Sequence, residues 1–595
     1  MKKLFTGNEA IARGVYEAGV VYASSYPGTP STEILDNIAK YKDDILAEWA
    51  NNEKVAMEAV TGASILGART FSSAKHVGIN VASDPLFAAA YSGVNGGMVI
   101  VTCDEPGQHS SQNEQDNRHY AEFAKIPMFE PASSQECKDM VVEAYELSEK
   151  YDCPVFIRMT TRVCHSKGIV ECGERKEVGI KEYVKNAKKY VTVPVNSKVR
   201  RRLLEERIIE LKKVAENSPL NISEIVEDSK VGIITSGMCY NYAKEVFGNE
   251  VSYLKIGFSY PLPSKTIKDF CEKFDEIYVL EENDMFLEKE VRVLGFDCKG
   301  NNFFPFMGEM TPDRIRKVVD GKNLDAIEYE KDKVVPRPPA LCAGCPHRGF
   351  YYELGKRKDI IVAGDIGCYS LAWAEPYNAM DFNTAMGGAP GLAHGGSQVL
   401  KMKGDTDKRI FATIGDSTFF HTGINGMIDM AYNGSNAVLC ILDNRITAMT
   451  GHQQNPGSGY TLQGKETKIL EIEPIVKSCG IDHVRTINPN DLKEVNDAID
   501  WALGIDGPVV IITRWPCVLK KLSAQDKSEF DNVFKTKNVI DQDKCIGCKK
   551  GTSVGCPAII FDKDKKKARI DSSSCVGCDV CSQVCPVGAI VKEEK

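Results

Sequence analysis

Four cysteines near residue 580 are spaced as ligands of iron–sulfur clusters are spaced. Cys575, Cys578 and Cys581 are followed by Cys585-Pro586, which gives the run CxxCxxCxxxCP. In this run three close thiolates hold one cubane cluster, and the fourth cysteine is a ligand of a second cluster. A zinc site needs only four ligands and does not require the run. The spacing therefore predicts iron–sulfur chemistry and electron transfer.

An earlier motif supplies the second half of this arrangement, with one ligand missing. Cys545 and Cys548 are followed by Cys556-Pro557, but Gly551 stands where a third cysteine is expected. The complete set, predicted to hold a 4Fe–4S cluster, is Cys556, Cys575, Cys578 and Cys581; the incomplete set is Cys545, Cys548 and Cys585. The incomplete set allows a 3Fe–4S cluster, an atypical 4Fe–4S cluster with a non-cysteine ligand, or no cluster.

A second group of residues has the types that bind magnesium and diphosphate. Gly415-Asp416-Ser417 follows the apolar run RIFATI, and Asn444 ends the apolar run AVLCILDN. Oxygen ligands at the ends of adjacent strands suit Mg²⁺, which retains phosphate oxygens as co-ligands. The turn also directs a helix N-terminus at an anion. The spacing is typical of thiamine diphosphate sites, and an ordinary Gly-Asp turn is the alternative.

Apolar runs that alternate with helical stretches surround these motifs. Such alternation predicts parallel sheets with helical crossovers, and so a multidomain α/β protein with a small α+β ferredoxin-like domain after it. In the first part of the chain the runs expected to form strands are VVYASSYP at 20–27, VGINVAS at 77–83, GMVIVTCDE at 97–105 and CPVFIRMT at 153–160.

Composition changes along the sequence divide it into five segments. The segment at 186–229 contains an amphipathic helix at 197–216, whose apolar face is Leu203, Leu204, Ile208 and Leu211 and whose basic residues alternate with glutamates, as in a solvated linker. The expected domains are three α/β domains at 1–185, 230–333 and 334–530, the last with the magnesium group, and an iron–sulfur domain at 538–595.

Bulk properties exclude some classes of protein. The formal net charge is -8 and the pI about 5.8, which argues against a nucleic-acid binder. We find no export signal and no apolar run long enough to span a membrane, and so expect a cytoplasmic protein. Without export, 21 cysteines indicate metal or redox chemistry in a reducing and, we infer, anaerobic cell.

Two further motifs make a family resemblance specific. They are YPGTPSTE at 26–33 and LCAGCPHR at 341–348. With the thiamine pattern and the cysteine-rich tail, they make the sequence similar to the 2-oxoacid:ferredoxin oxidoreductases, and most closely to the large subunits of those acting on indolepyruvate. The resemblance extends over the whole chain and its order of domains.

The resemblance implies roles for the magnesium group. Asp416, Asn444 and the carbonyl of Ile446 would hold Mg²⁺, and Gly415 to Ser417 would hold the diphosphate. Glu53, in NNEKVA, matches the glutamate that contacts the aminopyrimidine ring. A carboxylate at the ring nitrogen promotes the tautomer that deprotonates the thiazolium.

Alternatives stay open for Glu53 and for three other residues. Glu48 and Glu58 lie near Glu53 in the sequence, and all are compatible with a helix surface. The resemblance places Thr29 at the oxoacid pocket, although it also suits an ordinary turn. It makes Arg118 a bidentate clamp for the substrate carboxylate, with an ordinary surface salt bridge as the alternative. His421 would face the cofactor or be a structural histidine.

The resemblance also implies a proximal 4Fe–4S cluster beside the thiamine diphosphate. Its ligands would be Cys342 and Cys345 of the CxxC pair, with Cys368 of GDIGC and Cys517 of RWPC. The alternative is a pair that stabilises a turn and two unrelated buried thiols. Cys440 lies inside an apolar strand and is expected to be a core residue.

The implied activity is the oxidative decarboxylation of arylpyruvates, indolepyruvate and phenylpyruvate, to an arylacetyl-CoA and CO₂. Electrons would pass through the clusters to ferredoxin. The implied partners are a small second (β) subunit, ferredoxin and coenzyme A, in a dimer of heterodimers. Two alternatives are a non-oxidative thiamine-dependent decarboxylase or lyase, which the ferredoxin-like tail disfavours, and a non-catalytic electron-transfer subunit, which Glu53, Asp416 and Asn444 disfavour.

Overall fold

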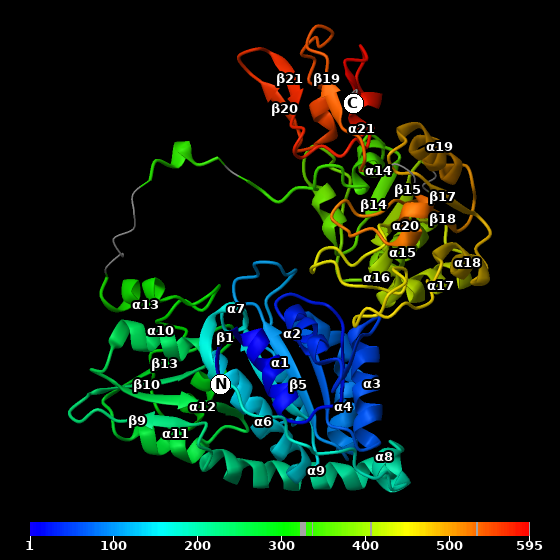
Figure 1. The fold of residues 1–595 in the computed structure, drawn as a ribbon. Helices are drawn as coiled ribbons and strands as arrows, with labels where there is room; N and C mark the ends of the chain where they lie inside the picture. Colours follow the sequence, from blue (N-terminus) through cyan, green and yellow to red (C-terminus); the bar gives the residue numbers. More distant parts are fainter. Residues whose placement is uncertain (322–328, 336, 405–406, 531–533, 594–595) are drawn as a thin grey trace. The chain divides into compact units, whose positions relative to one another are not determined.

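The computed structural model of the protein describes residues 1–321, 329–335, 337–404, 407–530 and 534–593. The chain divides into two compact units, Met1–Glu330 and Lys331–Lys595 (Figure 1). The division lies close to the boundary expected between residues 333 and 334. Pro336, in the proline-rich run VVPRPPA at 334–340 where the expected domain 334–530 begins, lies outside the described residues.

The larger sheet of the first unit has strands in the order β12-β6-β7-β5-β4-β2-β3. The pairs from β6 to β3 are parallel, and β12 adds antiparallel to β6 at the edge. The bounds are Tyr22–Ser25 (β2), Leu46–Trp49 (β3), Thr70–Lys75 (β4), Met98–Asp104 (β5), Met128–Phe129 (β6), Val155–Thr160 (β7) and Phe258–Tyr260 (β12). Three of the runs expected as strands therefore contain strands.

Helices connect these parallel strands, as parallel pairing requires. Helix α1 packs on α6, and α3 packs on α4. The bounds are Gly7–Glu17 (α1), Thr32–Ile38 (α2), Glu53–Ile65 (α3), His76–Ser92 (α4), Arg118–Ala124 (α5), Ser134–Tyr151 (α6) and Thr161–His165 (α7). Strands β1 (Lys2–Thr6) and β8 (Lys167–Glu171) form a separate antiparallel pair.

The prediction of a strand at 77–83 is wrong, because this run lies in helix α4. Its short alternation of apolar residues continues into a helical spacing. Ile79, Ala82, Leu86 and Ala89 are all buried in the core. These positions repeat every three to four residues, which is the period of a helix buried on one face.

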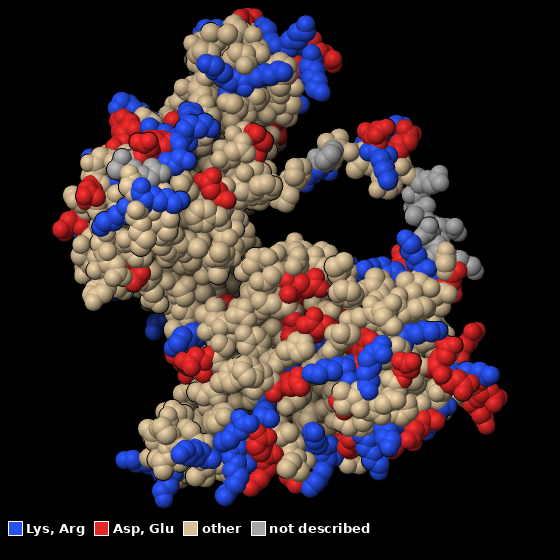
Figure 2. All heavy atoms as spheres, turned by 180° about the vertical axis from the view of Figure 1, so that it is seen from behind, with Lys and Arg blue, Asp and Glu red and all other residues tan. Residues whose placement is uncertain are grey.

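Helix α9 (Pro194–Glu216) is the helix expected at 197–216. Leu204, Ile208 and Leu211 are buried as predicted, whereas Leu203 is exposed. The solvent side carries pairs of opposite charge four residues apart. In Figure 2, blue and red side chains alternate along the edge that α9 forms. These pairs are Arg201 with Glu205 and Arg202 with Glu206.

A second sheet in the first unit has the order β13-β10-β11-β9. The apolar residues on one face of β10, β11 and β13, with those of α11 and α12, belong to the same core cluster as residues of β4, β5 and α4. Strand β12 also extends the first sheet from this later segment, so segments 1–185 and 230–333 share one core. The bounds are Ala187–Tyr190 (α8), Ile222–Glu224 (β9), Val231–Ser236 (β10), Gly237–Phe247 (α10), Ser252–Ile256 (β11), Ser264–Cys271 (α11), Glu276–Leu280 (β13), Leu287–Val293 (α12) and Pro312–Val319 (α13).

The second unit contains a fully parallel sheet in the order β14-β15-β16-β18-β17. The apolar runs RIFATI and AVLCILDN both contain strands of this sheet. The strand bounds are Ile360–Ala363 (β14), Arg409–Gly415 (β15), Val438–Asp443 (β16), Val484–Ile487 (β17) and Val509–Arg514 (β18). The helix bounds are His347–Leu354 (α14), Ala389–Lys403 (α15), Asp416–Thr418 (α16), Ile424–Tyr432 (α17), Ile472–Ser478 (α18), Leu492–Leu503 (α19) and Ala524–Glu529 (α20).

The cysteine-rich tail folds within this unit as two antiparallel strand pairs, β19 with β22 and β20 with β21. The bounds are Asn538–Ile540 (β19), Ile559–Asp562 (β20), Lys567–Ile570 (β21), Val580–Gln583 (α21) and Ile590–Lys592 (β22). The α/β fold class with an α+β tail is confirmed. Of the helices in the described part of the chain, none has both the length and the apolar composition of a membrane span.

Candidate functional site

The magnesium group lies at the carboxyl edge of the second unit's sheet. Gly415, at the end of β15, is in register with Leu442 of β16, so residues 416 and 444 leave the sheet side by side. Asp416, Asn444 and Ile446 are all buried. Asn444 Oδ1 accepts a hydrogen bond of 3.1 Å from the backbone N–H of Ile446. The sequence therefore predicted this group of residues as the fold assembles it.

Asp416 is in an environment that suits a cation. Burial, reinforced by the nearby negative charge of Asp443, raises the pKa of Asp416 to about 7. Its Oδ2 accepts a hydrogen bond of 3.0 Å from the side-chain amide of Asn455. Two buried carboxylates that repel each other are stabilised by a hard divalent cation between oxygen ligands. The donor set therefore fits Mg²⁺.

The turn after β15 is closely packed. A Cβ atom at Gly415 would lie 2.7 Å from the ring of Tyr369, so a larger residue would displace the aromatic ring or the turn. Thr447 Oγ1 donates to Ser417 Oγ over 2.7 Å. This bond ties the start of α16 to the chain that follows β16. The diphosphate loop expected at Gly415 to Ser417 is thus held on both sides.

His421 lies in a π-helical turn, Phe419–Gly423, that joins α16 to α17. It is buried, and its Nδ1 lies 3.0 Å from Thr422 Oγ1. The nearby Asp365 accepts hydrogen bonds from the backbone of Gly387 and Ala389. Burial raises the pKa of Asp365 to about 6, and the charge of His421 acts in the opposite direction. His421 therefore has polar neighbours within the site.

Two neighbours of the magnesium group were not predicted from the sequence. His347 Nε2 lies 3.4 Å from the side-chain amide nitrogen of Asn444, and burial lowers the pKa of His347 to about 4. Asn455 contacts Asp416 as described above. His347 belongs to the LCAGCPHR motif, in which only the cysteines were predicted to have a role. Asn455 has no spacing or residue type that would have identified it.

The four cysteines expected to hold a proximal cluster come together in the second unit. Cys345 and Cys517 are buried, Cys368 is half-buried and Cys342 is exposed. Burial raises the pKa of Cys368 to about 11, and the charges of Cys517 and Cys342 raise it further. Burial likewise raises the pKa of Cys345 to about 12, with Cys368 and Cys342 contributing. These mutual effects place the four thiols in one neighbourhood of the unit, as the ligands of one cluster would be.

Cys517 connects this cysteine group directly to the magnesium group. Its backbone N–H donates to the carbonyl oxygen of Asn444 at 3.0 Å. Burial raises the pKa of the Cys517 thiol, and the charge of Asp416 also contributes. The Cys517 Sγ lies 3.8 Å from His452 Nε2. The predicted cluster ligand Cys517 and the predicted magnesium ligand Asn444 are thus hydrogen-bonded neighbours.

The complete cysteine set of the tail is also assembled. Burial raises the pKa of Cys581 to about 12, and the charges of Cys578, Cys556 and Cys575 raise it further. Asn538 donates to this set through its backbone N–H, 3.3 Å from Cys575 Sγ, and through its side chain, 3.8 Å from Cys581 Sγ. Such N–H donors stabilise the negative sulfur atoms of a cluster.

The incomplete set has one thiol prepared for ionisation. Burial acts to raise the pKa of Cys585, but the backbone N–H groups around Ala589 hold it below its usual range. The Ala589 N–H lies 3.2 Å from Cys585 Sγ. Cys545 and Cys585 pack against the same small core. A Cβ at Gly551 would lie 3.1 Å from Ile590. The position where a third cysteine was expected therefore faces this core.

Glu53 begins helix α3 in the first unit and is largely buried, at 8% exposure. The helix is capped by the Asn52 side chain, which accepts the N–H of Val55. The Glu53 carboxylate lies over Gly78 of helix α4, where an added Cβ would come within 2.6 Å of Glu53 Oε1. Gly78 therefore leaves the space that Glu53 occupies.

Thr29 lies in the turn between β2 and α2 and is half-buried. A Cβ on the preceding Gly28 would lie 3.0 Å from the side chain of Lys75, at the end of β4. Lys75 is buried, which lowers its pKa, and Glu105 acts in the opposite direction from 3.3 Å. Sequence reasoning missed Lys75, because an isolated lysine after a strand carries no motif.

The prediction that Arg118 clamps a substrate carboxylate is wrong in this structure. Arg118 is fully buried, and each nitrogen of its guanidinium already has an acceptor. Its Nε donates to Asp116 at 2.9 Å and its Nη1 to Glu281 at 2.7 Å. Its Nη2 donates to the carbonyl oxygen of Glu282 at 2.8 Å. The alternative, an ordinary surface salt bridge, is wrong too, because these ion pairs and hydrogen bonds are buried. Those with Glu281 and Glu282 join segments 1–185 and 230–333.

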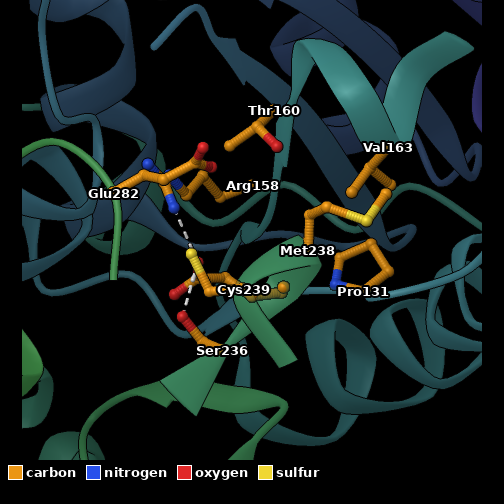
Figure 3. A pocket seen from close by; sticks show the side chains of 10 residues that line it. Pro131, Arg158, Thr160, Val163, Ser236, Met238, Cys239 and Glu282 are labelled. Carbon is orange, nitrogen blue, oxygen red and sulfur yellow. Dashed lines mark hydrogen bonds and ion pairs between the residues drawn. The ribbon is translucent and has the colours of Figure 1, made fainter. Parts of the chain in front are cut away.

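A second buried arginine stands beside a small cavity in the same region. Arg158 donates to Asp104 at 2.7 Å and to Glu130 at 2.8 Å. Figure 3 shows Arg158 near Glu282 and Cys239, around a cavity of about 10 Å³. Burial raises the pKa of Glu282 to about 7, while the N–H of Met310 and the charge of Arg158 oppose the rise.

Comparison with known proteins identifies three matching domain families. Residues 13–212 match the thiamine-diphosphate-binding domain of pyruvate flavodoxin/ferredoxin oxidoreductases. Residues 365–513 match the C-terminal TPP-binding domain of thiamine pyrophosphate enzymes. Residues 538–592 match a 4Fe-4S dicluster domain.

Relatives match the chain over nearly its whole length. Indolepyruvate oxidoreductase subunit IorA of Methanothermobacter marburgensis is 41% identical over 99% of this chain and 97% of its own. The IorA subunits of Pyrococcus horikoshii and Archaeoglobus fulgidus are each 39% identical, again over 99% of this chain and 97% of their own.

We predict that Glu282 makes the protein less stable as pH rises. A carboxyl group whose pKa is raised in the folded state binds its proton more tightly in the folded than in the unfolded protein. Its stabilising contribution to the free energy of unfolding is therefore lost as the pH rises from about 4.5 to 7. From the raised pKa of about 7, the loss is on the order of 3 kcal/mol. We therefore compare the thermal unfolding midpoints of full-length Glu282→Gln and wild type at pH 5 and at pH 8. The midpoint of the variant minus that of wild type should be larger at pH 8 than at pH 5.

Glu206→Gln is the control for this experiment. Glu206 is exposed on α9, where it pairs with Arg202. Its difference from wild type should stay constant over the same pH range. A constant difference for Glu282→Gln would contradict the prediction.

Proposed function

The chain belongs to the family of indolepyruvate oxidoreductase subunit IorA, and on that premise we propose that it catalyses the oxidative decarboxylation of arylpyruvates. The proposed substrates are indolepyruvate and phenylpyruvate. The products are an arylacetyl-CoA and CO₂, and ferredoxin receives the electrons. The family identifies a catalytic subunit of a 2-oxoacid:ferredoxin oxidoreductase, and the aryl preference is part of the proposal.

One observation carries the proposal: Cys517 donates its backbone N–H to the carbonyl oxygen of Asn444. An oxidative decarboxylase of this kind must release electrons beside the cofactor that carries the substrate carbon. A non-oxidative decarboxylase has no need of four cysteines beside its magnesium group. The hydrogen bond therefore favours the oxidative reaction over the first alternative, and the magnesium group itself disfavours a purely electron-transferring subunit.

Asp416, Asn444 and the carbonyl of Ile446 would hold Mg²⁺ and, with the Gly415 to Ser417 turn, the diphosphate. Thiamine diphosphate, when bound, supplies an electron sink for loss of CO₂, and iron–sulfur clusters supply one-electron acceptors. Glu53 would hold a proton at the aminopyrimidine ring. Its burial supports this role, because a desolvated carboxylate makes a stronger hydrogen bond.

The oxoacid side of the site would use Thr29, with His421 facing the cofactor. Since the guanidinium of Arg118 is fully occupied, we assign the cation for the substrate carboxylate to Lys75 instead. Lys75 is buried close to the Thr29 turn, and its ammonium group contacts only one carboxylate, that of Glu105, among the described residues. An ammonium in such a site attracts a carboxylate more strongly than one in water.

The cysteine sets would hold three centres. Cys342, Cys345, Cys368 and Cys517 would bind a proximal 4Fe–4S cluster. The complete tail set would bind another 4Fe–4S cluster, and Cys545, Cys548 and Cys585 a 3Fe–4S or atypical 4Fe–4S cluster. The word subunit in the names of the relatives supports a second, small β subunit as partner. A dimer of heterodimers, use of coenzyme A and a cytoplasmic location complete the proposal.

The test is anaerobic viologen reduction by the purified complex with thiamine diphosphate, Mg²⁺ and coenzyme A. Indolepyruvate and phenylpyruvate should support coenzyme-A-dependent reduction well above that with pyruvate. Reduction with pyruvate alone would retain the reaction and refute the aryl preference. No reduction by a complex with a full cofactor content would refute the oxidative function.

Gly78→Ala should impair catalysis although Gly78 itself touches no substrate. The added methyl would displace the Glu53 carboxylate, from which a Cβ at this position lies 2.6 Å. A shift of about 1 Å in a catalytic group costs about 100-fold in rate, which we expect in kcat of the viologen assay. Glu53→Gln should lose at least as much.

Gly62→Ala is the matched control, in the same helix as Glu53 with nothing within 4 Å of its Cβ position. It should keep full activity and stabilise α3 by about 0.5–1 kcal/mol. Equal activity of the Gly78→Ala and Gly62→Ala enzymes would contradict the proposed catalytic role of Glu53.

Cys368→Ala should remove the proximal cluster without unfolding the chain. We expect the loss of about four iron atoms per chain, because the set would lose one of its thiolates. Cys440→Ala is the control, since Cys440 is a buried thiol inside β16. Its iron content should equal that of wild type. Equal iron in both variants would show that Cys368 is not a ligand.

A further inference from the structure

Two loops that each contain a CxxC pair touch in the second unit. Gly344 lies between Cys342 and Cys345, and Val576 lies between Cys575 and Cys578. A Cβ at Gly344 would collide with a methyl group of Val576, and Gly344 has a φ of +71°, which favours glycine. The two loops therefore approach each other as closely as backbone and side chain allow.

Arg348 stands at this junction, near the start of helix α14. It is fully buried, and its Nη2 donates to the carbonyl oxygens of Leu341 at 2.8 Å and Cys342 at 2.7 Å. Its Nη1 donates to the carbonyl oxygen of Val554 at 2.9 Å and to the hydroxyl of Tyr377. Tyr377 bonds the same Val554 carbonyl at 2.9 Å. One guanidinium thus binds the backbone of the proximal set at Cys342 and the backbone close to Cys556 of the complete tail set.

The charge of Arg348 has no carboxylate partner among these hydrogen bonds. The acceptors are three carbonyl oxygens and one hydroxyl. Its Nε is buried and has no partner among the described residues. A buried charge without a counter-charge is costly. The sulfur atoms of a cluster bound to either neighbouring cysteine set would supply such a counter-charge.

The electrostatics of the thiols support this placement. Burial raises the pKa of Cys345 to about 12, and Arg348 is the foremost group that opposes the rise. Burial also raises the pKa of Cys578 to about 11, and Arg348 is again among the groups that oppose it. Cys345 belongs to the proximal set and Cys578 to the complete tail set. The same cation therefore acts on both sets.

We propose that Arg348 is the positioning residue of electron transfer between these two sets: it holds their loops together and favours the reduced state of a cluster bound to either. The proposal rests on the proposed function for the presence of the clusters. Transfer of one electron removes one negative charge from the proximal set and adds one to the tail set. No bond forms or breaks, and no proton moves.

The incomplete set serves as an internal reference. Arg348 contacts the tail at Val554 and Gly344 contacts it at Val576, and neither contact involves Cys545, Cys548 or Cys585. A charge acts on a group in proportion to the inverse of their separation and of the local dielectric constant. The potential of any cluster on the incomplete set should therefore respond less to loss of the Arg348 charge.

The experiment compares Arg348→Met and Arg348→Lys with wild type in the full complex, purified anaerobically. Iron content is measured first, and midpoint potentials are then obtained by mediated titration followed by electron paramagnetic resonance. Arg348→Met should shift two midpoints to more negative values, by at least the equivalent of a tenfold change in the reduction equilibrium, about 59 mV. Arg348→Lys keeps the charge and should shift them by less.

Arg409→Met is the matched control. Arg409 is a buried arginine of the same unit whose Nη2 donates to the carbonyl oxygen of Gly507 at 2.7 Å, with Asp506 as its charged neighbour. Removing it should disturb packing without moving any midpoint. Shifts as large as those of Arg348→Met in this control would overturn the proposal.

Unchanged midpoints in an iron-replete Arg348→Met complex would also overturn it. If Arg348→Met does not retain iron, Arg348→Gln, which also removes the charge, is titrated in its place, and unchanged midpoints in that iron-replete complex would overturn the proposal. The titration needs no oxoacid, so failure of the activity assay is distinguishable from failure of this proposal. Absence of iron from the wild-type complex would instead refute the cluster assignment on which it rests.

Discussion

Buried charge that must be neutralised is the constraint on which the internal junctions of this protein depend. Arg118 and Arg158 are surrounded by carboxylates, which compensate both their charge and their lost hydration. Arg348 is surrounded by carbonyl oxygens, which satisfy its donors and leave its charge uncompensated. The difference separates a structural role from one that needs a further negative group. In the first unit the carboxylates complete the network within the protein.

This network explains why segments 1–185 and 230–333 form one unit. Arg118 belongs to the first segment, and its partner Glu281 follows β13 of the later one. Glu281 lies where a parallel strand ends, the edge at which polar groups of parallel sheets collect, and Arg118 reaches it from the start of α5. Separating the segments would expose an apolar core and leave buried charges without partners, so both terms oppose it. The same rule of strand ends places Asp416, Asn444 and Cys517 together in the second unit.

Local features of the sequence were enough to predict much of the fold and of the site. Apolar runs predicted β2, β5 and β7 in the first unit and β15 and β16 in the second. Motif spacing predicted Asp416, Asn444 and the cysteines of the tail, and the family resemblance added the proximal set. Spacing says nothing of burial, and so it did not distinguish the internal Arg118 from an exposed clamp. Lys75 and Asn455 contact their neighbours through tertiary packing alone, which leaves no local pattern. The error at 77–83 arose because alternation over seven residues is too short to separate a strand from a helix buried on one face.

The hydrogen bond between Cys517 and Asn444 also couples the backbone positions of the proximal cysteine set and the magnesium group. Because the bond joins main-chain atoms, side-chain substitution at either residue leaves it in place, but a backbone shift at one is transmitted to the other. If both groups hold metal as proposed, loss of metal from one would thereby displace the ligands of the other, as expected where ligands are oriented by their neighbours. Loss of thiamine diphosphate affinity in a cysteine variant is consequently no evidence that the cysteine binds that cofactor. Only measurements that count iron and magnesium separately distinguish the two groups.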